Sequence, residues 1–278
     1  MIKFVVDSSA ELDKEFCEKN NIILLPNDVI FGDEVYVSGE TITNKQFFEK
    51  LRQGTVVPKT ALINQHRFAE VFKAAKKAGD ELIVMPISSK LSSTYNAALL
   101  AQQEVGYNKI YVLDHLTVTV AQTALVLEGM KMRDAGLTGE QIANKIMQLK
   151  DKIKLYAAVG SLKYLRAGGR LSGAAAVVGT MLNIKPIIEL TDGQIFSNYK
   201  CIGFKKAEQK LIDLVKDDFD PKMPIYLAHV DDIEEAKEFD KTFKQQVSGF
   251  IDGGLYEIGS VVGTHAGPGC VAVIYFRK

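Results

Sequence analysis

A cluster of hydroxyl side chains is the part of the sequence whose residue types best suit the binding of an anion. It consists of Ser88, Ser89, Ser92, Ser93 and Thr94. The cluster follows an apolar run and leads into a helix that the pattern predicts over residues 92–105. Backbone N–H groups at the start of a helix, with hydroxyls beside them, can bind an anion. The same residue types also serve as helix caps and turn residues without a ligand, so both interpretations stay open.

Polar residues also follow two other predicted strands. Asp7-Ser8-Ser9 comes after a strand over residues 2–6, and Asp114 comes after a strand over residues 109–113. In an open parallel sheet, ligands bind outside the carboxyl ends of the strands. We therefore expect these loops to share one edge of a sheet with the hydroxyl cluster.

The motif Gly168-Gly169-Arg170 lies between two predicted helices. Paired glycines permit backbone angles that other residues avoid. The guanidinium of Arg170 is a permanently charged, forked donor that suits a carboxylate or a phosphate. The alternative is a plain helix–loop–helix turn with a solvated arginine.

His265 belongs to a glycine-rich segment, residues 263–269, that is predicted as a loop between two apolar strands. A histidine there can donate a hydrogen bond to an anion or relay a proton near neutral pH. The alternative is an ordinary surface histidine. Gly267-x-Gly269-x-x-Ala272 matches a dinucleotide fingerprint in form, but no helix is predicted after it, so we reject that interpretation.

The elements that must position these groups alternate between strands and helices over the first half of the chain. Strands are predicted over residues 2–6, 22–31, 34–37, 81–87, 109–113 and 154–159, and helices over 11–20, 43–54, 64–77, 92–105, 118–135 and 138–149. Residues 58–60 are predicted as a loop. Apolar strands separated by helices indicate a parallel sheet that is covered on both faces.

The pattern changes after about residue 160. Helices are predicted over residues 161–166, 172–182, 205–218 and 233–247, and strands over 184–190, 195–202, 225–230, 255–260 and 270–277. Thr191-Asp192-Gly193 is a turn that joins the first two of these strands as a hairpin. The sequence therefore predicts an α/β protein with an N-terminal parallel-sheet α/β domain, residues 1–155, and a C-terminal α+β domain with a mostly antiparallel sheet, residues 156–278.

Composition excludes several classes of protein. The 278 residues include 34 Lys+Arg and 34 Asp+Glu, so the formal net charge is zero and no nucleic-acid partner is expected. Three cysteines without a Cys-x-x-Cys motif predict neither a disulfide framework nor a metal site. The sequence has no phosphate-binding loop of the G-x-x-x-x-G-K-[ST] type and no G-x-S-x-G elbow. Without a signal peptide or an apolar membrane span, the expected location is cytoplasmic.

Five motifs, taken in order, resemble those of the DegV family. They are Asp7-Ser8-Ser9-Ala10-Glu11-Leu12, residues 87–95, residues 162–172, Leu182-Asn183-Ile184-Lys185-Pro186 and His265-Ala266-Gly267-Pro268-Gly269. The resemblance spans essentially the whole chain and implies a DegV-like fold. It further implies a bacterial fatty-acid-binding protein that is the binding subunit of a fatty acid kinase and is not catalytic alone.

The same resemblance implies a ligand and partners. A long-chain fatty acid would be the bound ligand, with no other cofactor, and its tail would lie in a tunnel of the C-terminal domain. A separate kinase catalytic subunit would phosphorylate the carboxylate with ATP. An acyltransferase would then use the acyl phosphate in phospholipid metabolism. Transient contact with a membrane is compatible with this role.

Site residues are carried over by motif position. The implied ligand-binding residues are Thr60, Ser92, Ser93, Thr94, Arg170, His265 and Gly267. Thr60 and Ser93 would hydrogen-bond the carboxylate, with Ser92 as the alternative to Ser93. His265 would lie against the carboxylate, and Arg170 would flank it and help to dock incoming phosphate.

The chain departs from the family pattern at three places. Thr60-Ala61-Leu62-Ile63 stands where a Thr-Ser-Gln-Pro-like stretch is usual, Leu91-Ser92-Ser93-Thr94 replaces Leu-Ser-Gly-Thr, and Asp114-His115 replaces Asp-Ser. These departures affect the expected geometry around the head group more than the expected class of ligand. Small apolar residues at 174–179 and 181–182 are suited to line the tunnel, although ordinary core packing explains them equally well.

Two other classes of function stay open. Ser93 with His265 would supply the nucleophile and base of an acyl- or phosphoryl-transfer enzyme, although no Asp or Glu partner for the histidine can be assigned. A regulatory or interaction protein without a lipid is the third class.

Overall fold

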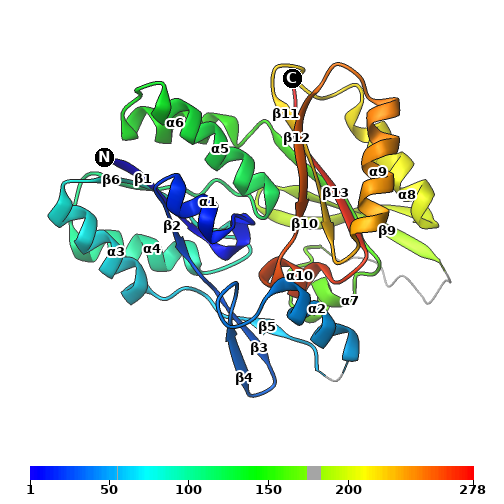
Figure 1. Ribbon diagram of the computed structural model, residues 1–278, viewed down its shortest axis with the longest axis horizontal. Coiled ribbons are helices and arrows are strands. Elements are labelled where there is room, and N and C mark those ends of the chain that lie inside the picture. Colours follow the sequence, from blue (N-terminus) through cyan, green and yellow to red (C-terminus); the bar gives the residue numbers. More distant parts are fainter. Residues whose placement is uncertain (55, 174–182) are drawn as a thin grey trace.

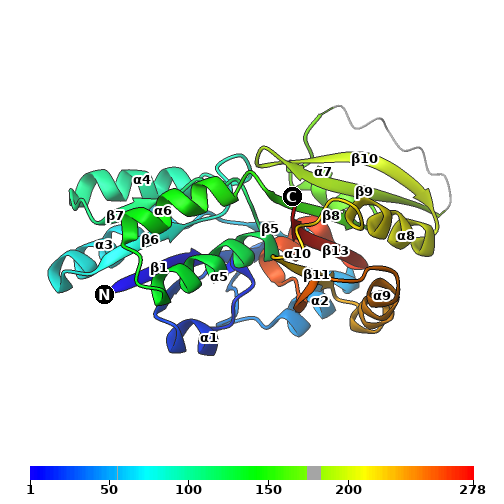
Figure 2. The ribbon, with the colours of Figure 1, turned by 90° about the horizontal axis from the view of Figure 1, so that it is seen from above.

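The computed structural model describes residues 1–54, 56–173 and 183–278. Their strands form a four-stranded sheet, a six-stranded sheet and a small three-stranded sheet. The two larger sheets lie side by side, each with its own helices (Figures 1 and 2). Within the described parts of the chain, no helix is both long and apolar enough to cross a membrane.

The four-stranded sheet is entirely parallel and has the order β2-β1-β6-β7. Its strands are β1 (Ile2–Asp7), β2 (Ile22–Leu25), β6 (Glu81–Met85) and β7 (Ile110–Val112). Alternate side chains of β1 enter different cores, because neighbouring residues of a strand point to opposite faces of the sheet. Phe4 and Val6 pack on one face and Val5 packs on the other, and all three are buried. This explains the apolar strands and confirms the predicted parallel sheet.

Helices cover both faces of that sheet. α3 (Gln65–Ala78) and α4 (Thr94–Val105) pack on the face that Val5 enters. α5 (Val120–Asp134) and α6 (Gly139–Leu149) pack on the opposite face, beside the short α1 (Lys14–Lys19). The helix predicted over residues 11–20 is too long at its start. Asp13 caps α1 by accepting a hydrogen bond from Phe16 N at 2.7 Å, and residues 8–10 form a separate 3₁₀ turn, η1 (Ser8–Ala10).

The six-stranded sheet has the order β10-β9-β8-β13-β11-β12, and every neighbouring pair is antiparallel except β11–β12. Its strands are β8 (Ile153–Ala158), β9 (Ile184–Thr191), β10 (Gln194–Ile202), β11 (Pro224–Val230), β12 (Ile251–Glu257) and β13 (Cys270–Phe276). The mostly antiparallel sheet and the β9–β10 hairpin match the sequence prediction. The domain division at residue 155 stays a prediction. The strand predicted over residues 154–159 was grouped with the parallel strands, but it is β8 of this sheet and pairs antiparallel with β9 and β13.

The two faces of the six-stranded sheet have different neighbours. α8 (Phe204–Val215) and α9 (Ile233–Gln246) cover the face that presents Tyr156 and Val273. The other face presents Leu155, Ala157 and Ala272 toward the core that contains α5 of the N-terminal half. The second face is the one that contributes to the site described below.

The three-stranded sheet corrects two sequence predictions. It consists of β3 (Asp28–Phe31), β4 (Glu34–Val37) and β5 (Lys59–Thr60). The single strand predicted over residues 22–31 is wrong. Strand β2 ends before Pro26-Asn27, and the next strand, β3, belongs to another sheet. Asn27 there exchanges hydrogen bonds with Ser8 at 3.2 and 3.0 Å. The loop predicted over residues 58–60 is wrong in part, since Thr60 pairs with Val29.

Two short helices, α7 (Lys163–Ala167) and α10 (Ser260–Ala266), complete the surroundings of the site. The strand predicted over residues 255–260 ends at Glu257, and the loop predicted over residues 263–269 begins with the last turn of α10. Ser260, which was predicted as the last residue of that strand, is the first residue of α10. α10 lies beside β5 and α2 (Asn44–Gln53), at the junction of the two halves (Figure 1). Within the helix predicted over residues 172–182, residues 174–182 lie outside the described part of the chain.

Candidate binding site

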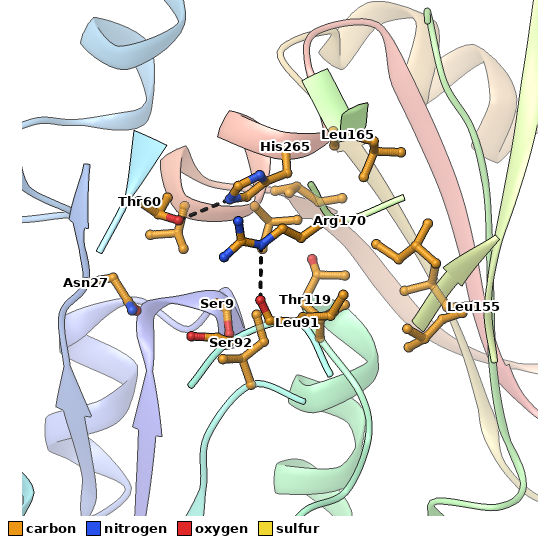
Figure 3. Close-up of a pocket in the computed structure, with 18 of the residues that line it drawn as sticks. Ser9, Asn27, Thr60, Leu91, Ser92, Thr119, Leu155, Leu165, Arg170 and His265 are labelled. Atoms are coloured by element: carbon orange, nitrogen blue, oxygen red, sulfur yellow. Dashed lines mark hydrogen bonds between the residues drawn. The ribbon is translucent and has the colours of Figure 1, made fainter. Parts of the chain in front are cut away.

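A cavity of about 230 Å³ lies between the four-stranded and six-stranded sheets (Figure 3). Its polar lining comes largely from the N-terminal half: Ser9, Asn27, Thr60, Ser92, Ser93 and Thr119. Its apolar lining comes largely from the C-terminal half and includes Leu155, Ala157, Leu165, Ile188, Leu190 and Ala272. Arg170 and His265 of the C-terminal half join the polar residues, so the cavity is lined by hydroxyl, imidazole and guanidinium groups together with apolar side chains.

Thr60 and His265 meet across the junction of the two halves. Thr60 Oγ1 lies 3.0 Å from His265 Nε2, although 205 residues separate them in the chain. Burial, together with the positive charge of Arg170, lowers the pKa of His265 to about 4. The imidazole is therefore neutral at pH 7, with one nitrogen as donor and the other as acceptor. Its Nδ1 is buried and has no hydrogen-bond partner among the described residues.

Gly168 is required for a different reason than the sequence indicated. Its φ of −81° is open to any residue, so the expected backbone freedom is not the cause. A methyl group at residue 168 would lie 2.1 Å from Nδ1 of His265, so glycine leaves room for the imidazole. Gly169 is the residue of the pair with a positive φ, 67°.

Arg170 lies beside His265 at the cavity, held by main-chain oxygens (Figure 3). Its Nε donates to Leu91 O at 3.1 Å, and its Nη1 donates to Gly168 O. The side chain is half-buried and connects the loop that follows α7 to the loop that precedes α4. The alternative of a freely solvated turn arginine is therefore wrong.

The hydroxyl cluster divides into cavity residues and structural residues. Ser92 and Ser93 line the cavity, whereas Thr94 is fully buried and is not part of the lining. Ser92 Oγ bonds Thr94 Oγ1 at 2.9 Å and accepts from Thr94 N at 3.2 Å. Ser93 is exposed and forms no cap, so α4 begins at Thr94. Its φ of −75° suits any residue, so serine causes no strain where the family pattern has glycine.

Other polar residues at this edge hold the loops together. Ser88 Oγ donates to Gly193 O at 2.9 Å, and Ser89 Oγ donates to Asp114 Oδ2 at 2.5 Å. The buried Asp7 accepts from Ile87 N at 2.7 Å. For these residues the capping and turn interpretation explains the sequence pattern fully.

Gly267, the remaining residue of the implied set, does not line the cavity. It ends α10 with a φ of 73°, and its N–H donates to Gly263 O at 2.9 Å. A side chain there would also collide with the ring of Tyr164, because a β-carbon would lie 2.2 Å from Cδ2. Gly267 therefore shapes the end of the helix that carries His265.

Two polar residues of the lining, Asn27 and Thr119, were not predicted from the sequence. Asn27 lies in the break between β2 and β3, which was predicted as the middle of one strand. Thr119 precedes α5, where the predicted helix began too early. Thr119 lies in the loop after β7, just as Ser9 lies after β1. Ligands bind outside the carboxyl ends of parallel strands, so a correct start for α5 would have made Thr119 a candidate.

This geometry does not support Ser93 and His265 as a nucleophile and base pair. His265 is bonded to Thr60, and no acidic partner orients it among the described residues. Its lowered pKa also makes it a weak base at neutral pH, where a general base works best with a pKa near the operating pH. The described residues contain no group of three or more His, Cys, Asp or Glu placed to hold a metal ion.

Comparison with known proteins identifies the family. The family model described as "Uncharacterised protein, DegV family" matches residues 1–278. A DegV domain-containing protein of Clostridium perfringens is 32% identical, with 99% of this chain and 98% of the relative covered. A second one, from Clostridium acetobutylicum, is 30% identical over 100% of this chain and 99% of the relative.

Solved structures agree with this result. A Thermotoga maritima protein described as revealing fatty acid binding function is 27% identical, with a TM-score of 0.87 over 99% of each chain. A stearic-acid-binding protein of Eubacterium ventriosum is 28% identical, with a TM-score of 0.88, and DegV of Bacillus subtilis, a fatty acid binding protein, is 26% identical, with a TM-score of 0.87. Each covers 100% of this chain and 99% of the solved one. From the match along its whole length, this chain belongs to the DegV family.

Proposed function

We propose that this chain binds a long-chain fatty acid, with the hydrocarbon tail in the apolar part of the cavity and the carboxylate at Thr60, His265 and the adjacent serines. The observation that carries the proposal is the cavity, which is lined by hydroxyl, imidazole and guanidinium groups together with apolar side chains. Solved members of the family from Thermotoga maritima, Eubacterium ventriosum and Bacillus subtilis are described as binding fatty acids.

The cavity is small for a ligand pocket. Its volume of about 230 Å³ is smaller than the roughly 300–1,000 Å³ of pockets that hold drug-sized molecules. An acyl tail of about 14 methylenes has a gross transfer free energy of ~11 kcal/mol, at ~0.8 kcal/mol each. A hydrogen bond to the carboxylate contributes about 1–3 kcal/mol. The tail therefore determines affinity, and the polar residues determine orientation.

Charge at the polar side suits a bound carboxylate. Arg170 supplies the positive charge there, and it is part of the cause of the lowered pKa of His265. A carboxylate placed beside both groups offsets that effect and raises the pKa of His265. In the bound state the imidazole is then a better hydrogen-bond donor.

We also propose that the chain presents the carboxylate to a separate ATP-dependent kinase subunit, which forms an acyl phosphate for an acyltransferase. The absence of the usual nucleotide motifs from the sequence supports a division of labour between two proteins. Arg170 lines the cavity where the carboxylate is proposed to bind, and its charge suits an incoming phosphoryl group. On this view the chain alone does not turn over substrate.

Native mass spectrometry tests the binding function. Protein purified from a bacterial host without detergent is expected to carry one long-chain fatty acid per chain. After removal of the lipid, it is expected to bind one added palmitate. A chain that is repeatedly empty and does not take up palmitate, stearate or oleate would contradict the proposal.

A further inference from the structure

Helix α10, which carries His265, has no cap of its own. Its N-cap residue is Gly259, which has no side chain to accept a hydrogen bond from the first turn. The first N–H groups of a helix lack partners within the helix and need outside acceptors. Glu11 Oε2 accepts from Gly259 N at 2.7 Å, and Asn44 Oδ1 accepts from Ser260 N at 3.2 Å. Both acceptors come from the N-terminal half of the chain.

Glu11 is also tied to a residue of the cavity wall. Thr119 Oγ1 donates to Glu11 Oε1 at 3.1 Å, and Thr119 lines the cavity. The two oxygens of one carboxyl group therefore connect η1, the start of α5 and the start of α10.

The backbone at both Glu11 and Thr119 is strained. Glu11 has a φ of 51°, and Thr119 has a φ of 53° with a ψ of −141°. A positive φ is uncommon for any residue with a side chain and is an outlier for a β-branched one. Such conformations persist where the surroundings hold them, and they concentrate at functional sites. Here both strained residues direct their side chains into the same hydrogen-bonded group.

Movement of α10 would change the wall of the cavity. Val261, Val262, His265 and Ala266 of this helix all line it. On another side of the helix, a methyl group at Gly263 would lie 2.7 Å from the ring of Phe48 in α2, so the helix is closely seated there. A shift at the first turn is therefore transmitted to His265 at the last turn, one short helix away.

From this geometry we propose that Glu11 is a positioning residue: it joins the two halves of the protein at the start of α10 and thereby sets His265 against Thr60 for the ligand carboxylate. The expected effect of Glu11 on affinity rests on the proposed fatty-acid binding. The contacts of Glu11 are those of the protein without ligand, so its effect on His265 can be measured separately.

The surroundings of Glu11 give the proposal a distinctive pH dependence. Burial raises the pKa of Glu11 to about 8, and the carboxyl groups of Asp7 on β1 and Glu257 on β12 act in the same direction. Hydrogen bonds from Gly259 and Thr119 oppose the rise. The other charged residues of the adjacent groove are Asp13 and Lys14 on the α1 side, Glu40 after β4 and Lys45 on α2.

The direction of the pH dependence follows from this raised pKa. In the folded protein Glu11 keeps its proton to a higher pH than a solvated glutamic acid, whose pKa is 4.5. Burial of the ionised carboxyl group is unfavourable, so the contribution of Glu11 to folding stability is complete below about pH 4.5 and is lost as the pH rises through about 8. The free energy of unfolding is expected to fall between pH 6 and 8 for this reason, and the Glu11→Gln variant, which cannot ionise, is expected not to show this fall.

The experiment compares Glu11→Ala, Glu11→Gln and the control Glu15→Ala, which removes an exposed acidic residue of α1. Delipidated proteins are titrated with palmitate at pH 7, and their free energies of unfolding are measured between pH 6 and 9. We expect Glu11→Ala to weaken binding about tenfold at pH 7, the size typical of a lost helix cap. Glu11→Gln keeps an acceptor for Gly259 N and should bind within about threefold of the unmodified protein at pH 7. Glu15→Ala should retain the affinity and the pH dependence of the unmodified protein.

Nitrogen-15 NMR of the histidine rings without ligand provides the second measurement. Glu11→Ala is expected to shift the His265 resonances, and Glu11→Gln to restore them. Unchanged His265 resonances in Glu11→Ala, or the same pH dependence in Glu11→Gln as in the unmodified protein, would overturn the proposal. If Glu11→Ala does not fold, the pH profile of Glu11→Gln decides. If no protein binds palmitate, the proposed function fails, and the His265 resonances still test the role of Glu11.

Discussion

Substitution of Ala272 by Phe is expected to weaken fatty-acid binding by roughly two orders of magnitude. Ala272 on β13 and Ala157 on β8 are directly paired, are at most 3% exposed, and both line the apolar part of the cavity. A phenyl ring at this point would fill space that the tail requires. Excluding about four methylenes costs ~3 kcal/mol at ~0.8 kcal/mol each, which corresponds to a factor of ~200 in affinity. Titration of the delipidated variant with palmitate measures the effect.

Controls separate exclusion of the tail from damage to the fold. Ala135→Phe places the same ring at an exposed residue after α5 and should leave affinity unchanged. Ala272→Val should give an intermediate loss. Because the ring enters an existing cavity and does not overpack a filled core, we expect Ala272→Phe to keep the unfolding temperature within a few degrees. A folded Ala272→Phe protein that binds palmitate as tightly as before would show that the tail lies elsewhere.

The second large effect concerns the proposed partner reaction. Arg170→Ala is expected to lower kinase-dependent formation of acyl phosphate by about a hundredfold, the lower end of the range for loss of one donor that stabilises developing charge. Fatty-acid affinity should fall by less than about fivefold, because the tail supplies most of the binding free energy. The guanidinium lines the cavity, and two of its N–H groups donate to Leu91 O and Gly168 O, so those two do not bind the ligand. The measurement pairs palmitate titration with an assay of acyl phosphate using ATP and the kinase subunit.

Two variants sharpen this test. Arg170→Lys keeps the positive charge but lacks the fork, so it should recover only part of the acyl phosphate formation. Arg277→Ala removes an exposed arginine at the other end of β13 and should behave as the unmodified protein. Equal losses of binding and of acyl phosphate formation in Arg170→Ala would contradict a role for Arg170 in the phosphoryl step.

The sequence predicted the sheets well and the local details of the site less well. Apolar strands separated by capped helices indicated the parallel sheet, because burial on both faces leaves a clear pattern. Helix α10 was not predicted, because it obtains its caps from Glu11 and Asn44, which lie more than 200 residues away in the chain. No local pattern contains that information.

In the site too, residue types were predicted from local sequence, whereas their positions depend on contacts between distant parts of the chain. His265 and Arg170 were singled out by residue type, and the structure brings both to one cavity with Thr60. Thr94 and Gly267 turned out to support neighbouring residues from outside the cavity. The reason for Gly168 was also hidden, because its neighbour His265 comes from a helix almost 100 residues later. Spacing shows which residues share an element, and packing decides which of them face a ligand.

The most direct test of the account is a crystal structure with a palmitate analogue that carries bromine at its methyl end. The account predicts an anomalous bromine peak among apolar side chains such as Leu155, Leu165 and Ile188, with the carboxylate within hydrogen-bond distance of Thr60 or His265. A bromine peak outside this cavity, or a cavity left empty at saturating ligand, would contradict it.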